Sequence, residues 1–206
     1  MLESLTRRIA GAVSGAGEPC QDASRAGFKH ELLARLRGEQ TIRQMRKQGL
    51  RAPDPFYIAS HVSIDPGFAW AVEIGAHATL SFHVRVIAHD AAMWHLTGYT
   101  LVRPVKIGTR CYIGAGTTIL PGAVIGDGAV IGAGSVVRGE IPAGTIAAGN
   151  PARVIGHIGE LRERHLQAIS ETPRFEKGPA DPGGLSASEL DAMKRALETH
   201  GSFYVR

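Results

Sequence analysis

Residues 107–142 read IGTRCY IGAGTT ILPGAV IGDGAV IGAGSV VRGEIP, and every sixth residue of this stretch is a β-branched aliphatic. These six residues are Ile107, Ile113, Ile119, Ile125, Ile131 and Val137. A small or medium-sized residue follows each of the first five after four positions: Cys111, Thr117, Ala123, Ala129 and Ser135. A period of six is typical of a parallel β-helix, in which each repeat is a short strand plus a turn and stacked coils bury one aliphatic column. The alternative, a glycine-rich linker, is disfavoured because linkers are rich in serine and charge and lack in-phase isoleucine.

The composition agrees with such a coil. Hydrophobic residues make up 44% of the 206 residues but aromatic residues only 6%, which suits a coil filled by Ile, Val and Ala. The formal net charge of +4 suits small anionic ligands, and because the chain has no dense block of Lys and Arg, we expect no nucleic-acid partner. The two cysteines, Cys20 and Cys111, are too few for a disulfide framework, and Cys111 is predicted to be a reduced core thiol.

The chain also has no long apolar segment. The N-terminus MLESLTRRIAGAVSGAG has no h-region of a signal peptide, and no stretch approaches the roughly twenty apolar residues of a membrane span. These features predict a cytoplasmic protein with no integral membrane segment.

The pattern divides the chain into three parts. Residues 1–57 form an N-terminal segment, in which 28–48 has the apolar spacing of an amphipathic helix. Residues 58–157 form the coil, and residues 158–206 form a C-terminal helical extension with helices expected at 159–170 and 186–201. Ser186 or Ser188 is the candidate cap of the second helix, and residues 171–184 between the two helices read as a loop.

Two breaks interrupt the period of the coil. Four extra residues stand at Trp70–Glu73, and the spacing from Val86 to Ile107 is 21 residues, which is not a multiple of six. A loop over residues 88–104 must therefore leave the coil. In a repeat fold, insertions tend to collect on one face, often the binding face.

Three histidines, His77, His83 and His89, each hold the fourth place of a hexad. A metal site is one interpretation, because neutral imidazoles are good zinc ligands. However, if each hexad makes one face of a three-faced coil, the three side chains point in different directions and cannot converge within one chain. His77 and His83 are therefore expected to be surface residues, and no metal is expected.

His89 differs because it begins the insertion. An imidazole at a cleft can take a proton from a hydroxyl as a general base, a contribution of roughly 10²- to 10⁴-fold. The alternative is a surface histidine in a loop. The next residue, Asp90, is a candidate catalytic residue that would either orient an imidazole or cap the loop.

Further candidates lie in and after the loop. Trp94, His95 and Tyr99 are candidate substrate-binding residues, since the two aromatic rings could form a flat wall for a sugar; they could equally anchor the loop. The arginines Arg103, Arg138 and Arg153 are candidates for contact with an anion, because a guanidinium matches phosphate oxygens; the alternative is a solvated surface charge.

The run IGAGTTILPGAVIGDGAVIGAGSVV, the closing IPAGTIAAGNPARVI and the preceding AHD loop resemble the hexapeptide-repeat acyltransferases. The resemblance covers about residues 58–157 and is greatest to the sugar O-acetyltransferase branch, which includes maltose, galactoside and polysaccharide acetyltransferases. It implies a mainly β fold, a left-handed parallel β-helix. It also implies a homotrimer with active sites between subunits, a sugar or glycan acceptor, and acetyl-CoA as co-substrate.

The resemblance also implies roles for single residues. In such enzymes a loop histidine, here matching His89, deprotonates the acceptor hydroxyl, which attacks the thioester directly. The pantetheine arm passes positions that match Tyr112, Ala115 and Ala133, and the nucleotide end lies near positions that match Pro151 and Arg153.

Two departures from the small free-sugar enzymes bear on the acceptor. A lysine that contacts CoA phosphates in the maltose and galactoside type is replaced by Gly139, with Arg138 one place earlier as the candidate contact. Asp90 stands after the histidine, as in polysaccharide and lipopolysaccharide O-acetyltransferases, where the free-sugar enzymes have proline. The resemblance therefore favours acetylation of a sugar hydroxyl in surface polysaccharide or lipopolysaccharide biosynthesis.

Three other functions remain open on sequence alone. They are N-acetylation of an amino-sugar nucleotide, a metal-dependent activity of the γ-carbonic-anhydrase type on the same coil, and a non-catalytic scaffold.

Overall fold

The computed structural model describes residues 42–178 and 183–205. The chain divides into two compact units, residues 1–48 and 49–206. In the first unit the described residues form one short helix, α3 (Ile42–Lys47). The rest of the expected amphipathic helix, from Phe28 to residue 41, and Cys20 lie outside the described residues.

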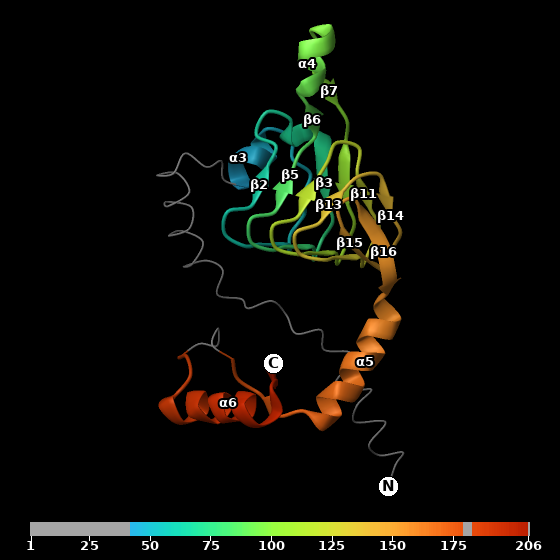
Figure 1. The fold of residues 1–206 in the computed structure, drawn as a ribbon. Coiled ribbons are helices and arrows are strands. Elements are labelled where there is room, and N and C mark those ends of the chain that lie inside the picture. The colour runs from blue at the N-terminus through green and yellow to red at the C-terminus, as the bar shows by residue number, and fades with distance from the viewer. Residues whose placement is uncertain (1–41, 179–182, 206) are drawn as a thin grey trace. The chain divides into compact units, whose positions relative to one another are not determined.

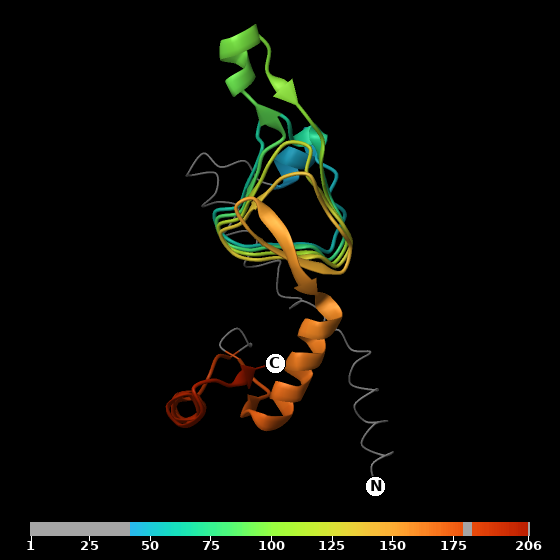
Figure 2. The same ribbon diagram turned by 45° about the vertical axis from the view of Figure 1, so that its right-hand side comes forward.

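The second unit is a parallel β-helix with three flat faces, and Figure 2 shows its triangular section. The first face stacks β1 (Tyr57–Ile58), β4 (Thr79–Leu80), β9 (Tyr112–Ile113), β12 (Val130–Ile131) and β15 (Thr145–Gly149). The second face stacks β2 (Ser63–Ile64), β5 (Arg85–Val86), β10 (Thr118–Ile119) and β13 (Val136–Val137). The third face stacks β3 (Val72–Ile74), β8 (Val105–Ile107), β11 (Val124–Ile125) and β14 (Glu140–Ile141). The predicted mainly β fold built on a parallel β-helix is confirmed.

The six-residue aliphatics form the interior of this prism. Parallel strands pair in register, so that Leu80 lies opposite Ile113 and Ile113 opposite Ile131. Ile113, Ile119 and Ile131 have no solvent exposure, as expected of a column buried between stacked coils. The small side chains at the fifth place are buried beside them. Cys111, one of these, is a buried free thiol whose pKa is raised by burial.

The fourth place of the hexad is a left-handed turn position. Its backbone has a positive φ at His61, His77, His83 and Arg110 (53–61°) and at the glycines Gly116, Gly122, Gly128 and Gly134 (65–84°). Glycine reaches this region without the steric cost of a Cβ, which explains why it recurs there. His77 and His83 are exposed, as expected from the sequence.

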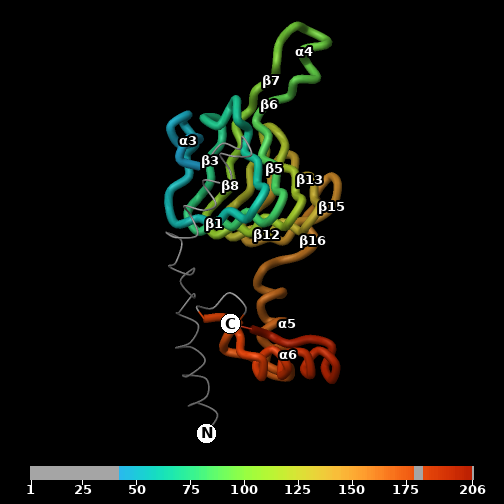
Figure 3. Tube along the Cα trace, turned by 90° about the vertical axis from the view of Figure 1, so that its left-hand side faces the viewer, coloured from blue at the N-terminus to red at the C-terminus, as the bar shows by residue number. Residues whose placement is uncertain are grey.

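The corner between the second and third faces departs from the six-residue spacing. The spacing there is ten residues from Ile64 to Ile74 and 21 residues from Val86 to Ile107, whereas in the next coil it is six residues from Ile119 to Ile125. The first excess contains the 3₁₀ helix η1 (Ala69–Ala71). The second contains β6 (His89–Asp90), α4 (Ala92–Thr97) and β7 (Leu101–Val102), which leave the coil as an antiparallel pair with α4 at the tip (Figures 1 and 3).

The coil ends in an antiparallel hairpin, where β15 pairs with β16 (Ala152–His157). The two predicted helices follow as α5 (Ile158–Glu171) and α6 (Ala187–His200), and Ser186 caps α6 in a capping box with Glu189. The expected loop between the helices was wrong in one detail, because it contains β17 (Arg174–Phe175), which pairs with β18 (Tyr204–Val205). Among the described residues no helix has the length and apolar character needed to cross a bilayer.

Candidate active site

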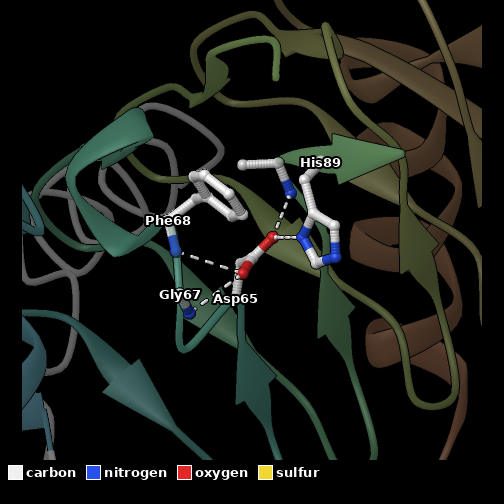
Figure 4. Close-up of polar contacts among 5 residues, drawn as sticks. Asp65, Gly67, Phe68 and His89 are labelled. Carbon is white, nitrogen blue, oxygen red and sulfur yellow. Dashed lines mark hydrogen bonds and ion pairs between the residues drawn. The ribbon is translucent and has the colours of Figure 1, made fainter. Parts of the chain in front are cut away.

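A buried carboxylate and a histidine meet at the irregular corner. Asp65 Oδ2 lies 2.5 Å from Nδ1 of His89, and Figure 4 shows the imidazole directed at the carboxylate with Nε2 on the far side of the ring. The Asp65 side chain is 1% exposed, whereas that of His89 is 34% exposed. The pair therefore joins an enclosed carboxylate to an imidazole that solvent or a substrate can reach.

Backbone N–H groups hold Asp65 in place. Its Oδ1 accepts hydrogen bonds from the N–H groups of Gly67 and Phe68, each at 3.2 Å, and its Oδ2 accepts one from the N–H of Ala88 at 3.0 Å (Figure 4). Burial by itself raises the pKa of this carboxyl. The hydrogen bond with His89 and those from the backbone of Ala88 and Phe68 outweigh burial, so the pKa lies below its ordinary value of 3.8. Asp65 is therefore ionised near neutral pH.

The ionised carboxylate fixes the proton on the imidazole. A carboxylate only accepts hydrogen bonds, so Nδ1 of His89 donates to Asp65 and carries the ring proton in the neutral imidazole. The lone pair of Nε2 then faces away from Asp65. This is the arrangement of a general base whose tautomer and orientation are set by a carboxylate.

Stacking of the coils brings the two residues together across 24 positions. Asp65 directly follows β2, and its N–H donates to the carbonyl of Val86 at the end of β5. Three residues after Val86 the chain turns out of the coil, and His89 pairs with Val102 in the β6–β7 ladder. Although His89 holds a fourth place, it does not have the positive φ of His83, because the insertion replaces the turn at this hexad.

Asp65 is not among the residues that the sequence pattern predicted for the site. The signal that could have found it is the four-residue break, because the run DPGF lies between Ile64 and that break, and the 88–104 insertion leaves the same corner one coil later. The four-residue break and the 88–104 insertion both interrupt the hexapeptide repeat at the same corner. Such a corner is a candidate site, because its residues do not follow the repeat pattern.

Asp90 makes a different contact. Its Oδ1 accepts a hydrogen bond from the N–H of Ala92 at 2.9 Å, so the carboxylate caps the turn that leads into α4. Of the two functions left open for Asp90, the structure shows the capping contact, and the carboxylate that contacts His89 is Asp65.

The candidate substrate-binding residues lie on the protruding segment. Trp94 and His95 are part of α4, and Tyr99 follows the helix after Gly98, whose φ of +75° ends it. Trp94 is 60% exposed and Tyr99 79% exposed. The two rings thus present apolar surface to the surroundings of the loop.

The residues matched to CoA contacts fall mainly at another corner. Ala115 and Ala133 stack one coil apart between the first and second faces, where the N–H of Gly134 donates to the carbonyl of Ala115, and the exposed Tyr112 lies beside them on the first face. Pro151 and Arg153 are exposed in the closing hairpin, and Arg153 donates to the carbonyl of Ala152. Arg138 and Arg103 are exposed at the corner that carries His89.

The structure brings no metal-ligand set together in the part of the chain it describes. No group of three His, Cys, Asp or Glu side chains there could hold a metal ion. His83 stacks on His61, with ring centroids 4.9 Å apart and an interplanar angle of 8°, in a column of turn residues.

The stacked hexads define the class of this protein as a hexapeptide-repeat β-helix protein. Residues 104–139 match the family model described as bacterial transferase hexapeptide, six repeats. The chain is 37% identical over 97 residues to YvoF of Bacillus subtilis (strain 168), provisionally named an acetyltransferase, and 36% identical over 110 residues to Protein CapG of Staphylococcus aureus. These matches show that the coil of this chain is similar to hexapeptide-repeat transferases.

The matches cover part of each protein. The first covers 47% of this chain and 54% of YvoF, and the second 52% of this chain and 64% of CapG, so the chain spans somewhat over half the length of these relatives. Nodulation protein L of Rhizobium leguminosarum bv. viciae is 63% identical over 57 residues, which are 28% of this chain and 30% of that protein.

Two solved structures are similar to part of this chain. A maltose O-acetyltransferase from Clostridium difficile 630 is 27% identical, with a TM-score of 0.48 over 64% of this chain and 85% of that one. A mutant of AntD, an N-acyltransferase from Bacillus cereus in complex with dTDP-4-amino-4,6-dideoxyglucose and Coenzyme A, is 24% identical, with a TM-score of 0.44 over 55% of this chain and 69% of that one.

Proposed function

We propose that this protein is an acetyl-CoA-dependent O-acetyltransferase that acetylates a sugar hydroxyl, with His89 as general base. The observation that carries the proposal is the Asp65–His89 pair on a hexapeptide coil, which presents an oriented Nε2 at the surface. A biosynthetic role in the cytoplasm, on a surface polysaccharide or lipopolysaccharide precursor, is part of the same proposal. It rests on the resemblance of the AHD loop to enzymes of that kind.

The residues present can perform a direct transfer. Nε2 of His89 accepts the proton of the acceptor hydroxyl as its oxygen attacks the thioester carbonyl. The imidazolium then returns this proton to the sulfur as the carbon–sulfur bond breaks, so that free CoA and the acetyl ester leave. Throughout, Asp65 stays ionised and stabilises the imidazolium through Nδ1.

The distribution of candidate residues supports a site shared between copies. His89 lies at the corner between the second and third faces, whereas Ala115 and Ala133 lie at the corner between the first and second. The second face separates these corners, so the two sets of residues lie apart within a single chain. A homotrimer that places one corner of a copy against another corner of its neighbour would complete the site.

The test is the variant His89→Ala. Without Nε2, we expect turnover to fall by roughly 10²- to 10⁴-fold, with KM for acetyl-CoA little changed. The measurement is release of free thiol from acetyl-CoA across a panel of mono- and oligosaccharides. The matched control is His83→Asn, because His83 holds the same hexad place and asparagine tolerates its positive φ.

Two results would decide against parts of the proposal. Unchanged turnover in His89→Ala, with the variant folded as judged by circular dichroism, would remove His89 from the mechanism. A product that resists mild base would be an amide, and the reaction would then be N-acetylation of an amino sugar.

A further inference from the structure

We propose that Phe68 and Trp70 form an aromatic platform that binds a pyranose ring of the acceptor beside His89. The inference rests on the proposed function, since it identifies the acceptor subsite of the same site. It concerns residues outside the protruding loop, at the irregular corner of the preceding coil between Ile64 and Ile74.

The platform is continuous with the candidate base. The ring of Phe68 lies 5.0 Å from the imidazole of His89, centroid to centroid, at an interplanar angle of 40°. The indole of Trp70 lies 6.3 Å from Phe68 at 61°. The three rings therefore follow one another in the order His89, Phe68, Trp70. The N–H of Phe68 donates to Asp65, which also contacts His89.

Trp70 is exposed although its backbone is held tightly. Its residue is 57% exposed, while its neighbours Ala69 and Ala71 in η1 are buried. On the other side, a Cβ added to Gly49 would lie 2.7 Å from the Cβ of Trp70, so this glycine allows the two segments to touch. The fold thus fixes the base of the indole and leaves its ring uncovered.

A fixed, exposed indole beside a base suits a sugar. The C–H groups on one side of a pyranose form a flat, weakly positive surface that packs on the electron-rich face of an aromatic ring. With one ring stacked on Trp70, its hydroxyls project sideways, and the acceptor can extend past Phe68 toward His89. An open-chain polyol has the hydroxyls but lacks the flat surface.

The chain has two tryptophans, Trp70 and Trp94, which allows a direct binding test without acetyl transfer. In Trp94→Phe the fluorescence reports Trp70, and in Trp70→Phe it reports Trp94. The probes are maltose, lactose and chitobiose, with sorbitol as the open-chain control. We expect a saturable change in Trp94→Phe with at least one disaccharide and none with sorbitol. No change with any disaccharide, or an equal change with sorbitol, would overturn the platform.

Kinetics with an acceptor that supports thiol release gives a second readout. Trp70→Ala should raise KM for the acceptor roughly 3- to 10-fold, the scale of one aromatic contact, with KM for acetyl-CoA unchanged. Trp70→Phe should restore most of the loss because it keeps a ring. A rise in KM for acetyl-CoA alone would place the indole at the donor and contradict the proposal.

The two proposals fail in different ways. Saturable binding to Trp70 without thiol release with any acceptor would leave the platform and reject the acetyltransferase. Thiol release that depends on His89 but has the same acceptor KM in Trp70→Ala would leave the enzyme and reject the platform.

Discussion

His83 and His89 hold the same place in successive hexads, yet the structure uses them in opposite ways. His83 has a φ of +58°, lies exposed at a regular turn and stacks on His61. His89 leaves the coil, pairs with Val102 and donates to the buried Asp65. The hexad place determines where a side chain emerges, and the chain around it determines whether that side chain has a chemical partner.

The same contrast separates two corners of the prism. Between the first and second faces the six-residue spacing is kept, and the turn residues His61, His83, Gly116 and Gly134 all have positive φ. Between the second and third faces two successive coils carry extra residues, and these bring Asp65, Phe68 and His89 together. A regular repeat makes a uniform surface, so a site with distinct residues arises where the repeat is interrupted.

Asp65→Asn is expected to abolish most of the activity that the irregular corner supports, because it removes the carboxylate that contacts His89. Both oxygens of Asp65 accept backbone N–H groups, so either orientation of an asparagine amide places its NH₂ against a donor. An NH₂ directed at Nδ1 would also move the ring proton to Nε2 and abolish the base. We expect turnover to fall by up to roughly 10⁴-fold, the scale for replacing a carboxylate that orients a catalytic histidine by an amide. Steady-state thiol release measures it.

Asp90→Asn is the matched comparison, because it makes the same change on a nearby carboxylate, which accepts a hydrogen bond from Ala92 in the turn that leads into α4. Its loss of turnover should be much smaller, and equal losses would contradict the orienting role of Asp65.

The dependence of stability on pH gives an independent test of the Asp65 contacts. Because the pKa of Asp65 is lowered in the folded state, its charge stabilises the fold above about pH 3.8, and this contribution disappears as pH falls through the lowered pKa. The difference in free energy of unfolding between wild type and Asp65→Asn should therefore shrink below about pH 4.

Substitutions in the regular part of the coil should change the free energy of unfolding and leave turnover unchanged. Ile125 is 1% exposed in the aliphatic column, whereas the adjacent Val124 on β11 is 40% exposed on the outer face. Ile125→Ala should lower the free energy of unfolding by about 2–5 kcal/mol, from lost burial and the cavity left behind. Val124→Ala should change it by at most about 0.5 kcal/mol. Denaturant unfolding at one protein concentration measures both, and similar losses would mean that Val124 is buried in an assembly.

The regular half of the molecule could be predicted from the sequence because it depends on periodicity alone. The spacing of Ile107, Ile113 and Ile119 specifies both the buried column and the turns, and one spacing of 21 residues locates the insertion. The buried column, the turns and the insertion all follow from the spacing of the aliphatic residues and from the need to bury them.

The candidate site could be predicted only in part. His89 stands out because it begins the insertion, but Asp65 lies 24 residues earlier, and their contact depends on how the extra residues fold at the corner. Asp90 is next to His89 in the sequence, but its carboxylate accepts a hydrogen bond from Ala92, and the carboxylate that contacts His89 is that of Asp65. Contacts between irregular segments carry no period, so the sequence pattern does not reveal them.

Gly128→Ala tests the turn that His83 and the glycines share, and it has the smallest expected effect. Gly128 has a φ of +65°, and an added Cβ would meet nothing within 4 Å, so crowding plays no part. If the left-handed backbone is required there, alanine should destabilise the fold by about 1–2 kcal/mol. Gly128→Asn should cost less, because asparagine visits this region more readily. If the turn can relax to negative φ, alanine should instead stabilise by about 0.4–1 kcal/mol, through the reduced entropy of the unfolded chain. The sign of the change in melting temperature thus decides whether the regular turn is fixed by the stacked coils above and below it.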